Sequence, residues 1–293
     1  MSIKKTITIG ANTTYPLTVK RFGYGTMRLT GEQVWGEPEN RDEALAILKA
    51  TSDNGIQFID TADFYGADVT NRLIAEALYP YNKDVLICTK VGVARGADKS
   101  WQVYDKPDNL RASIEKNLQT LKTEQIQLVH FRVMPGSATP FETSLQTMFE
   151  MQREGKILHI GLSNVSKEEL EIALQMGNIA TVENVFGYEQ RNSFTTGGME
   201  LRGMHEVLDT CVKEHIVMIP FFSLQTSLHN KENKITVIAQ KYGVTNAQVN
   251  LAWALHFNDL ILPIPGTSKL THFHENCKAF DLELSKEDLQ FLG

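Results

Sequence analysis

The chain has 293 residues, of which 42% are hydrophobic and 22% are charged, a composition typical of a globular protein rather than a disordered or fibrous one. Its net charge of -6 argues against a nucleic-acid partner, which requires a cationic surface. No run of 18 apolar residues predicts a membrane span.

The N-terminus and the cysteines indicate the compartment. Residues 1–20 alternate polar and apolar side chains and lack the apolar core of a signal peptide. The three cysteines, Cys88, Cys211 and Cys277, are odd in number and far apart, which favours a reducing environment over a disulfide framework. We therefore expect a cytoplasmic protein.

Short apolar strands alternate with amphipathic helices along the whole chain. The first predicted elements are a hairpin and a strand within 6–25. The later strands are predicted over 57–60, 84–90, 126–131, 157–163, 180–186, 216–222 and 260–266. The helices between and after them are predicted over 41–55, 70–78, 109–121, 141–155, 167–177, 198–215, 232–243 and 269–277, with an inserted helix over 246–256.

Eight strand–helix pairs in a chain of this length predict an α/β fold, a closed (β/α)8 TIM barrel, in a single domain over 1–293. An open doubly wound sheet is the alternative that alternation alone allows. The strands are apolar and mostly continuous, as expected where a parallel sheet is covered by helices. The N-terminal hairpin lies outside the repeat, and we expect it to plug the barrel floor.

Polar side chains follow three successive predicted strands. Asp60 ends one strand and Tyr65 lies in the loop after it, Lys90 ends the next, and His130 lies near the end of the third. In a TIM barrel the active groups gather at these carboxyl ends of the strands, so we expect the four residues to share one mouth.

Each of the four residues has a plain structural interpretation when taken alone: a loop cap, a packing residue, a snorkelling lysine and a buried histidine. Together they indicate chemistry. An ammonium next to a phenol lowers the phenol pKa, which makes Tyr65 a candidate general acid, and Asp60 is the expected partner of Lys90. No G-x-S-x-G nucleophile motif is present, which favours hydride attack from a bound cofactor.

At these residues the chain resembles the aldo-keto reductase family. The resemblance covers nearly the whole chain and rests on FIDTADFYG, TKVG, LVHF, GKILHIGLSN and IPGTSKLTHFHEN in this order. It implies reduction of an aldehyde or ketone by a nicotinamide cofactor, with Tyr65 as proton donor. Lys90 and Asp60 would tune the phenol, and His130 would help to place the carbonyl.

The resemblance also implies which residues bind the cofactor, expected to be NADPH with NADH possible. They are Gly25, Thr26, Met27, Asp60, Ser163, Asn164, Asn184, Phe221, Leu224, Gly266, Thr267, Ser268, Lys269, His272, Glu275 and Asn276. Phe221 would stack on the nicotinamide, and Thr267 to Lys269 would meet the adenosine phosphate at a helix N-terminus. Gly266 and His272 depart from the lysine and arginine that the family often has there, which weakens the preference for NADPH.

Within the family, NRLIAEALYPY, LVHFRVMPG and IPFFSL are most similar to bacterial pyridoxal reductases, which makes pyridoxal the leading substrate. Trp35, Phe64 and Trp101 fall in mouth loops and are candidates to stack an aromatic ring, with Arg132 binding a polar substituent. Ordinary loop packing is the alternative for each of them.

Other functions stay open at this point. The chain is alternatively a reductase of another aldehyde class, or a cofactor-binding, redox-sensing regulatory subunit with slow turnover. A metal-dependent barrel hydrolase needs several His and Asp ligands at the strand ends, and no metal site is expected here. The expected partner is a small carbonyl compound, with no nucleic acid, membrane or obligate protein partner.

Overall fold

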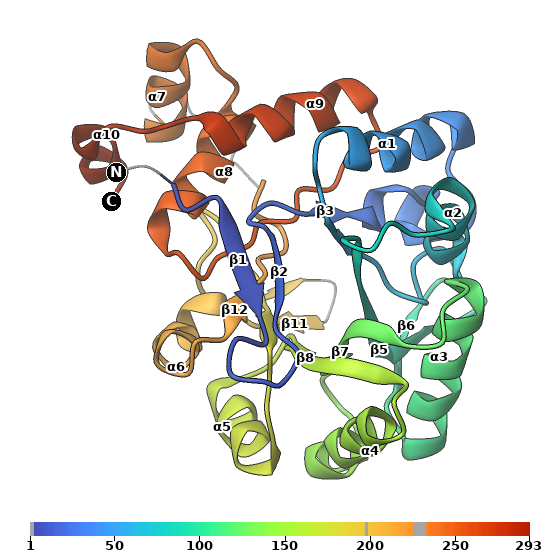
Figure 1. Ribbon diagram of the computed structural model, residues 1–293. Coiled ribbons are helices and arrows are strands. Elements are labelled where there is room, and N and C mark those ends of the chain that lie inside the picture. Colours follow the sequence, from blue (N-terminus) through green and yellow to red (C-terminus); the bar gives the residue numbers. More distant parts are fainter. Residues whose placement is uncertain (1–2, 197–198, 225–232) are drawn as a thin grey trace.

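The computed structural model describes residues 3–196, 199–224 and 233–293, and it contains a barrel of parallel strands surrounded by helices (Figure 1). Neighbouring strands follow the chain order, as successive strand–helix units require. They are β3 (Tyr24–Gly25), β4 (Phe58–Asp60), β5 (Leu86–Arg95), β7 (Ile126–Arg132), β8 (Ile157–Ser163), β9 (Thr181–Glu183) and β12 (Val217–Met218).

The segment 260–264 closes the barrel between β12 and β3. Met218 and Ile261 form a parallel bridge, and Leu262 N donates to Met218 O at 2.9 Å. On the other side, Gly23 N donates to Pro263 O at 2.9 Å. Proline offers no N–H to a ladder, so this eighth segment does not form a regular strand although one was predicted over 260–266. The (β/α)8 prediction is confirmed.

Helices follow most of the strands and cover the outside of the barrel (Figure 1). They are α1 (Arg41–Asp53), α2 (Val69–Leu78), α3 (Pro107–Thr120), α4 (Phe141–Arg153), α5 (Lys167–Met176), α6 (Leu208–Lys213), α7 (Lys234–Tyr242), α8 (Asn246–Phe257), α9 (Leu270–Lys278) and α10 (Lys286–Leu292). Local sequence fixes several starts: Ser166 with Glu169, and Thr245 with Gln248, form capping boxes. The inserted helix is confirmed as α8.

The helix predicted over 198–215 is wrong in its first half, where Met199–Leu201 forms β11, paired with β10 (Phe194–Thr196). Only α6 is α-helical there, after a short 3-10 turn at Met204–Glu206. Apart from short 3-10 turns, two further elements of the described residues were not predicted. They are α10 and the strand β6 (Trp101–Tyr104), which pairs with the extended end of β5 and carries Trp101 to the barrel mouth.

The N-terminal hairpin closes the opposite end of the barrel, as predicted. Strands β1 (Thr6–Ile9) and β2 (Leu17–Lys20) pair antiparallel, and their buried side chains pack against the ends of the barrel strands. The apolar cluster at this floor comprises Ile7, Ile9 and Val19 with, among others, Phe58, Leu86, Leu128 and Val217. Burial of this cluster leaves the other end of the barrel as the open one.

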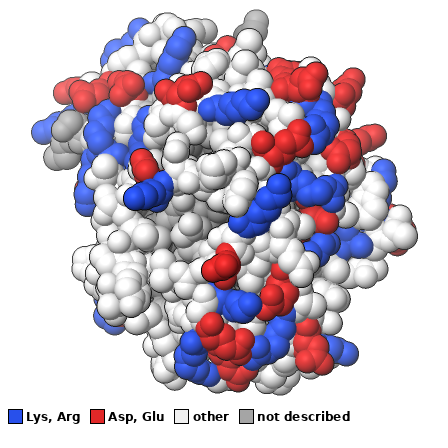
Figure 2. Space-filling model, turned by 45° about the vertical axis from the view of Figure 1, so that its right-hand side comes forward, with Lys and Arg blue, Asp and Glu red and all other residues white. Residues whose placement is uncertain are grey.

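No helix within the described residues is long and apolar enough to cross a bilayer. Acidic and basic side chains are interspersed over the face shown in Figure 2, so this face carries no extended patch of one sign.

Candidate active site

Lys90 is a buried ammonium held by two carboxylates. Its Nζ lies 2.5 Å from Asp60 Oδ1 and 3.3 Å from Glu183 Oε1, and it also donates to Thr61 O at 3.2 Å. Lys90 is 1% exposed, and both carboxylates are 2% exposed. A buried lysine needs such partners because an unpaired charge away from water is costly. The predicted pairing of Lys90 with Asp60 is present in the structure, and Glu183 is a second partner that the sequence analysis missed.

His130 contacts the second of these carboxylates, Glu183. Its Nδ1 is 2.7 Å from Glu183 Oε2, and its Nε2 is 2.6 Å from Thr181 Oγ1. The Cys88 thiol approaches the same Nδ1 at 3.4 Å. With both ring nitrogens engaged and no exposed surface, His130 is an interior hydrogen-bonding residue in this arrangement.

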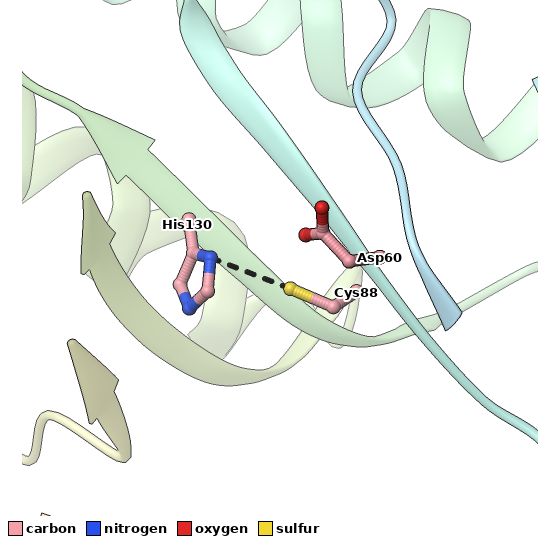
Figure 3. Close-up of side chains that lie close together, drawn as sticks. All are labelled: Asp60, Cys88 and His130. Carbon is pink, nitrogen blue, oxygen red and sulfur yellow. Dashed lines mark hydrogen bonds between the residues drawn. The ribbon is translucent and has the colours of Figure 1, made fainter. Parts of the chain in front are cut away.

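Asp60, Cys88 and His130 converge from β4, β5 and β7 with donor atoms of the kind that bind metals (Figure 3). Their geometry fits a hydrogen-bonded cluster instead. Asp60 already contacts the Lys90 ammonium, and a cation among these atoms would be repelled by it. His130 Nδ1 is directed at Glu183.

The two carboxylates titrate as a pair around one ammonium. Burial and the charge of Glu183 raise the pKa of Asp60 to about 7, against the opposing effect of Lys90. Burial also raises the pKa of Glu183, but Lys90 and the His130 hydrogen bond outweigh it and lower that pKa to about 2. The pKa of Lys90 lies well above its ordinary value because the carboxylates overcome the effect of burial. Lys90 is therefore charged throughout the working pH range.

Tyr65 lies next to this ammonium, with Lys90 Nζ 5.2 Å from the centre of its ring. Lys90 lowers the pKa of the phenol, as expected from the sequence. Burial and the charges of Asp60 and Glu183 raise this pKa by more than Lys90 lowers it. The net pKa is above the ordinary value, so the expectation of a more acidic resting phenol is wrong. Burial costs the phenolate more than one nearby cation returns.

One cavity of about 490 Å³ opens beside Tyr65 at the barrel mouth. This volume is within the range of small-molecule sites. The residues that line the cavity include the following ones predicted from the sequence as site residues: Gly25, Met27, Asp60, Phe64, Tyr65, Trp101, Arg132, Phe221, Leu224 and Gly266. The other lining residues, which were not predicted to belong to the site, are Arg28, Glu183, Thr196, Met199, Leu201, Phe222, Ser223, Ile264 and Pro265.

Aromatic side chains form one wall of this cavity. Phe64 packs edge-to-face on Tyr65 at 5.3 Å between ring centres and on Trp101 at 5.8 Å. The Arg95 guanidinium lies 4.1 Å from the Trp101 ring centre and 5.6 Å from that of Trp35, and thereby ties two mouth segments together. Trp35 is not among the lining residues.

Comparison with known proteins identifies this architecture. A family model described as the aldo/keto reductase family matches residues 21–292. The chain belongs to the aldo/keto reductase family. It is accordingly an oxidoreductase of a class that acts on small carbonyl compounds.

Individual relatives agree with this assignment. The chain is 37% identical over 280 residues to "pyridoxine 4-dehydrogenase" of Escherichia coli K12, covering 94% of each protein. It is 34% identical to an uncharacterized oxidoreductase of Schizosaccharomyces pombe, covering 92% of this chain and 85% of that protein. Among solved structures, a thermostable aldo-keto reductase in complex with the inhibitor epalrestat superimposes with a TM-score of 0.80 at 26% identity, covering 100% of this chain and 98% of that one.

A Klebsiella pneumoniae aldo/keto reductase crystallised with NADP and acetate has the same fold, with a TM-score of 0.77 at 22% identity. The superposition covers 99% of this chain and 94% of the Klebsiella pneumoniae chain.

His130, Asn164 and Asn184 are among the predicted site residues that do not line the cavity. Asn164 donates to Val133 O and Glu200 O, and its Oδ1 accepts from Arg202 N. Asn184 exchanges two hydrogen bonds with the backbone of Val165, at 2.8 and 3.0 Å. Both amides thus bind the protein backbone, whereas they were predicted to hold a carboxamide.

Ser163 and Thr26 also support other groups. Ser163 is buried, and its Oγ accepts from Arg132 Nη1 at 3.1 Å. Thr26 Oγ1 donates to Asp60 O at 2.9 Å.

The residues predicted to bind the adenosine end gather around the start of α9. Tyr24 donates to Thr267 O, and Ser268 and Lys269 are exposed. His272 and Glu275 follow on α9, with Asn276 buried.

A carboxylate from α1 already lies at this helix start. Glu43 Oε1 accepts from Leu270 N at 3.0 Å, and Oε2 lies 3.3 Å from Lys269 Nζ. Both hydrogen bonds lower the pKa of Glu43, so it is ionised.

Proposed function

We propose that this protein reduces an aldehyde to an alcohol with NADPH, that pyridoxal is its leading substrate, and that Tyr65 donates the proton. The observation that carries the proposal is the placement of Tyr65 beside the Lys90 ammonium on one wall of an apolar, aromatic cavity. NADH remains a possible second cofactor.

The chain offers a fitting site for the cofactor. Gly25 and Gly266 lie so close that a Cβ at Gly266 would meet Gly25 O at 2.7 Å, and both line the cavity beside Phe221 and Leu224. This part of the cavity wall therefore consists of backbone without side chains, which leaves room for a long flat ligand to lie against it. The Phe221 ring offers an aromatic face, and Thr267 to Lys269 with Glu275 and Asn276 would hold the adenosine end. The bound dihydronicotinamide supplies a hydride to the carbonyl carbon.

Proton donation is the task of the residues around Tyr65. Its raised pKa keeps the phenol protonated over the working pH range, so the acid is always loaded. The alkoxide that forms from a carbonyl is a stronger base than phenolate and takes the proton. Lys90 then stabilises the phenolate by charge, and Asp60 and Glu183 keep Lys90 protonated.

Pyridoxal as substrate is supported by the 37% identity to pyridoxine 4-dehydrogenase over 94% of both chains. Phe64 and Trp101 present an aromatic wall suited to a flat pyridine ring. Arg132 lines the same cavity and offers a cation to a polar substituent.

The test is an assay of NADPH and NADH oxidation with pyridoxal, its 5'-phosphate, and simple aromatic and aliphatic aldehydes. We expect turnover of pyridoxal with NADPH, and a loss of roughly 10²- to 10⁴-fold in kcat for Tyr65→Phe with unchanged cofactor affinity. Wild-type kcat in that variant would refute the role of Tyr65. Tight cofactor binding without turnover of any aldehyde would instead favour the redox-sensing regulatory subunit.

A further inference from the structure

Arg132 occupies the last position of β7, at the cavity mouth and two residues beyond His130. Side chains two apart on a strand share a face, so both point into the barrel, and Arg132 lies one layer closer to its mouth. It lines the cavity together with Tyr65, and it is close enough for each charge to bear on the pKa of the other.

Most of the hydrogen-bonding capacity of this guanidinium is unused. Arginine has five N–H donors. Within residues 3–196, 199–224 and 233–293, the one oxygen that accepts from Arg132 is Ser163 Oγ, at 3.1 Å. Its other contacts are Met199 Sδ at 4.0 Å and the Phe221 ring centre at 5.4 Å. Because Arg132 lines the cavity, its remaining donors are available to a ligand that binds there.

Arg132 also lacks a direct ionic partner among the carboxylates of the described chain. The anions facing this end of the barrel are Asp60 and Glu183, and both are held by Lys90, with His130 on Glu183. Tyr65 is neutral. A half-buried cation without a partner, in an apolar cavity, is best satisfied by an anionic oxygen of the ligand.

We propose that Arg132 selects aldehydes that carry an ionised oxygen on the ring carbon adjacent to the aldehyde. The planar guanidinium fork matches two neighbouring oxygens, so one N–H would contact the carbonyl oxygen and another the phenolate. This inference rests on the proposed carbonyl reduction and names its substrate class. Pyridoxal belongs to this class, since its phenolic oxygen is adjacent to the aldehyde.

This arrangement would turn the reacting oxygen toward Tyr65 while the ring lies against Phe64 and Trp101. Hydride adds to the carbonyl carbon and the Tyr65 proton goes to its oxygen, while the phenolate stays unchanged. Arg132 thus acts on orientation, and its charge offsets the repulsion between the phenolate and the two carboxylates.

The experiment compares 2-hydroxybenzaldehyde with two control aldehydes. 4-Hydroxybenzaldehyde has the same phenolate in the wrong place, and 2-methoxybenzaldehyde has the oxygen in the right place but cannot ionise. We expect the 2-hydroxy compound to be preferred in kcat/KM by roughly ten- to a hundredfold. The preference should grow as pH rises through the pKa of its phenol. Equal kcat/KM values for the three aldehydes would overturn the proposal.

Arg132→Gln should abolish this preference, and Arg132→Lys should restore only part of it because an ammonium lacks the fork. The matched control is Arg202→Gln. Arg202 lies near the mouth but is paired with Glu200 at 2.9 Å and does not line the cavity. It should keep the wild-type preference. A preference that survives in Arg132→Gln would refute the role of Arg132.

Binding gives a second measurement that does not need turnover. Quenching of Trp fluorescence, with Trp101 in the cavity wall, should give a dissociation constant for 2-hydroxybenzaldehyde that Arg132→Gln raises by about tenfold. If pyridoxal is not reduced but this ortho preference depends on Arg132, the pyridoxal assignment fails and the inference stands. If pyridoxal is reduced and Arg132→Gln leaves binding and preference unchanged, the inference fails alone.

Discussion

Glu183 Oε1 lies 3.3 Å from Lys90 Nζ, and so gives the buried Lys90 ammonium a second carboxylate in addition to Asp60. Two carboxylates around one cation cannot both ionise easily in a buried site. The consequence is a carboxyl, Asp60, whose pKa is raised to about 7 by burial and by Glu183.

This arrangement predicts a pH dependence of carbonyl reduction. Below pH 7 Asp60 is protonated, and one anion fewer opposes the formation of a phenolate at Tyr65. As pH rises through about 7, Asp60 ionises, the pKa of Tyr65 rises, and kcat should fall several-fold. In Glu183→Gln the pKa of Asp60 drops, so this transition should move to lower pH. Profiles of kcat from pH 5 to 9 measure the position of this transition. The control is Glu200→Gln, because Glu200 does not line the cavity. An unmoved transition in Glu183→Gln would contradict the coupling.

His130 is predicted to matter for stability more than for proton transfer. It is fully buried, and its nitrogens contact Thr181 and Glu183. His130→Gln should therefore lower the free energy of unfolding by roughly 1–3 kcal/mol per unsatisfied partner, while kcat changes less than tenfold. Denaturant unfolding and steady-state kinetics on one preparation separate the two effects. A hundredfold loss of kcat at unchanged stability would instead assign His130 to the carbonyl, as the sequence suggested.

The sequence predicted the barrel well because the strand–helix alternation is a pattern of local periodicity. Element bounds were close for α1, α4, α5 and α9. The prediction failed at 198–215, where the chain forms the hairpin β10–β11 and then α6. Its apolar residues are consistent with either structure, and tertiary contacts at the mouth select the hairpin.

The site was predicted less completely, and strand alternation explains why. On β9 and the residue after it, Thr181 and Glu183 share the inner face, and Asn184 points the other way, to Val165. On β7, His130 and Arg132 share a face, but only Arg132 reaches the cavity. A period of two would have indicated Glu183 over Asn184. The depth of His130 below the mouth depends on where the strand ends, which the sequence does not reveal.

Cofactor preference should depend on Glu43. Its carboxylate accepts from Leu270 N and pairs with Lys269, where the 2'-phosphate of NADPH is proposed to bind. A phosphate there must compete with Glu43 for Lys269 and withstand its charge. Glu43→Gln should therefore raise kcat/KM for NADPH relative to NADH by about five- to tenfold. Asp42→Asn, the neighbouring exposed carboxylate, is the control. An unchanged NADPH-to-NADH ratio in Glu43→Gln would place the phosphate elsewhere.

Asp63 is predicted to limit stability at high pH. It is 6% exposed, its Oδ1 has no hydrogen-bond partner among the described residues, and burial raises its pKa to about 7 despite Ser113 and Lys116. In the unfolded chain an Asp ionises near pH ~4, whereas Asp63 in the native protein stays protonated up to about pH 7. The contribution of this protonated carboxyl to the free energy of unfolding is therefore complete below pH ~4 and is lost as pH rises to about 7. Asp63→Asn removes the titration while keeping the side-chain shape. Its gain in the free energy of unfolding should therefore be larger at pH 8 than at pH 5, by roughly 2–3 kcal/mol. Urea unfolding of both proteins at the two pH values measures this difference. An equal effect of Asp63→Asn at both values would mean that Asp63 has an ordinary pKa in the native protein.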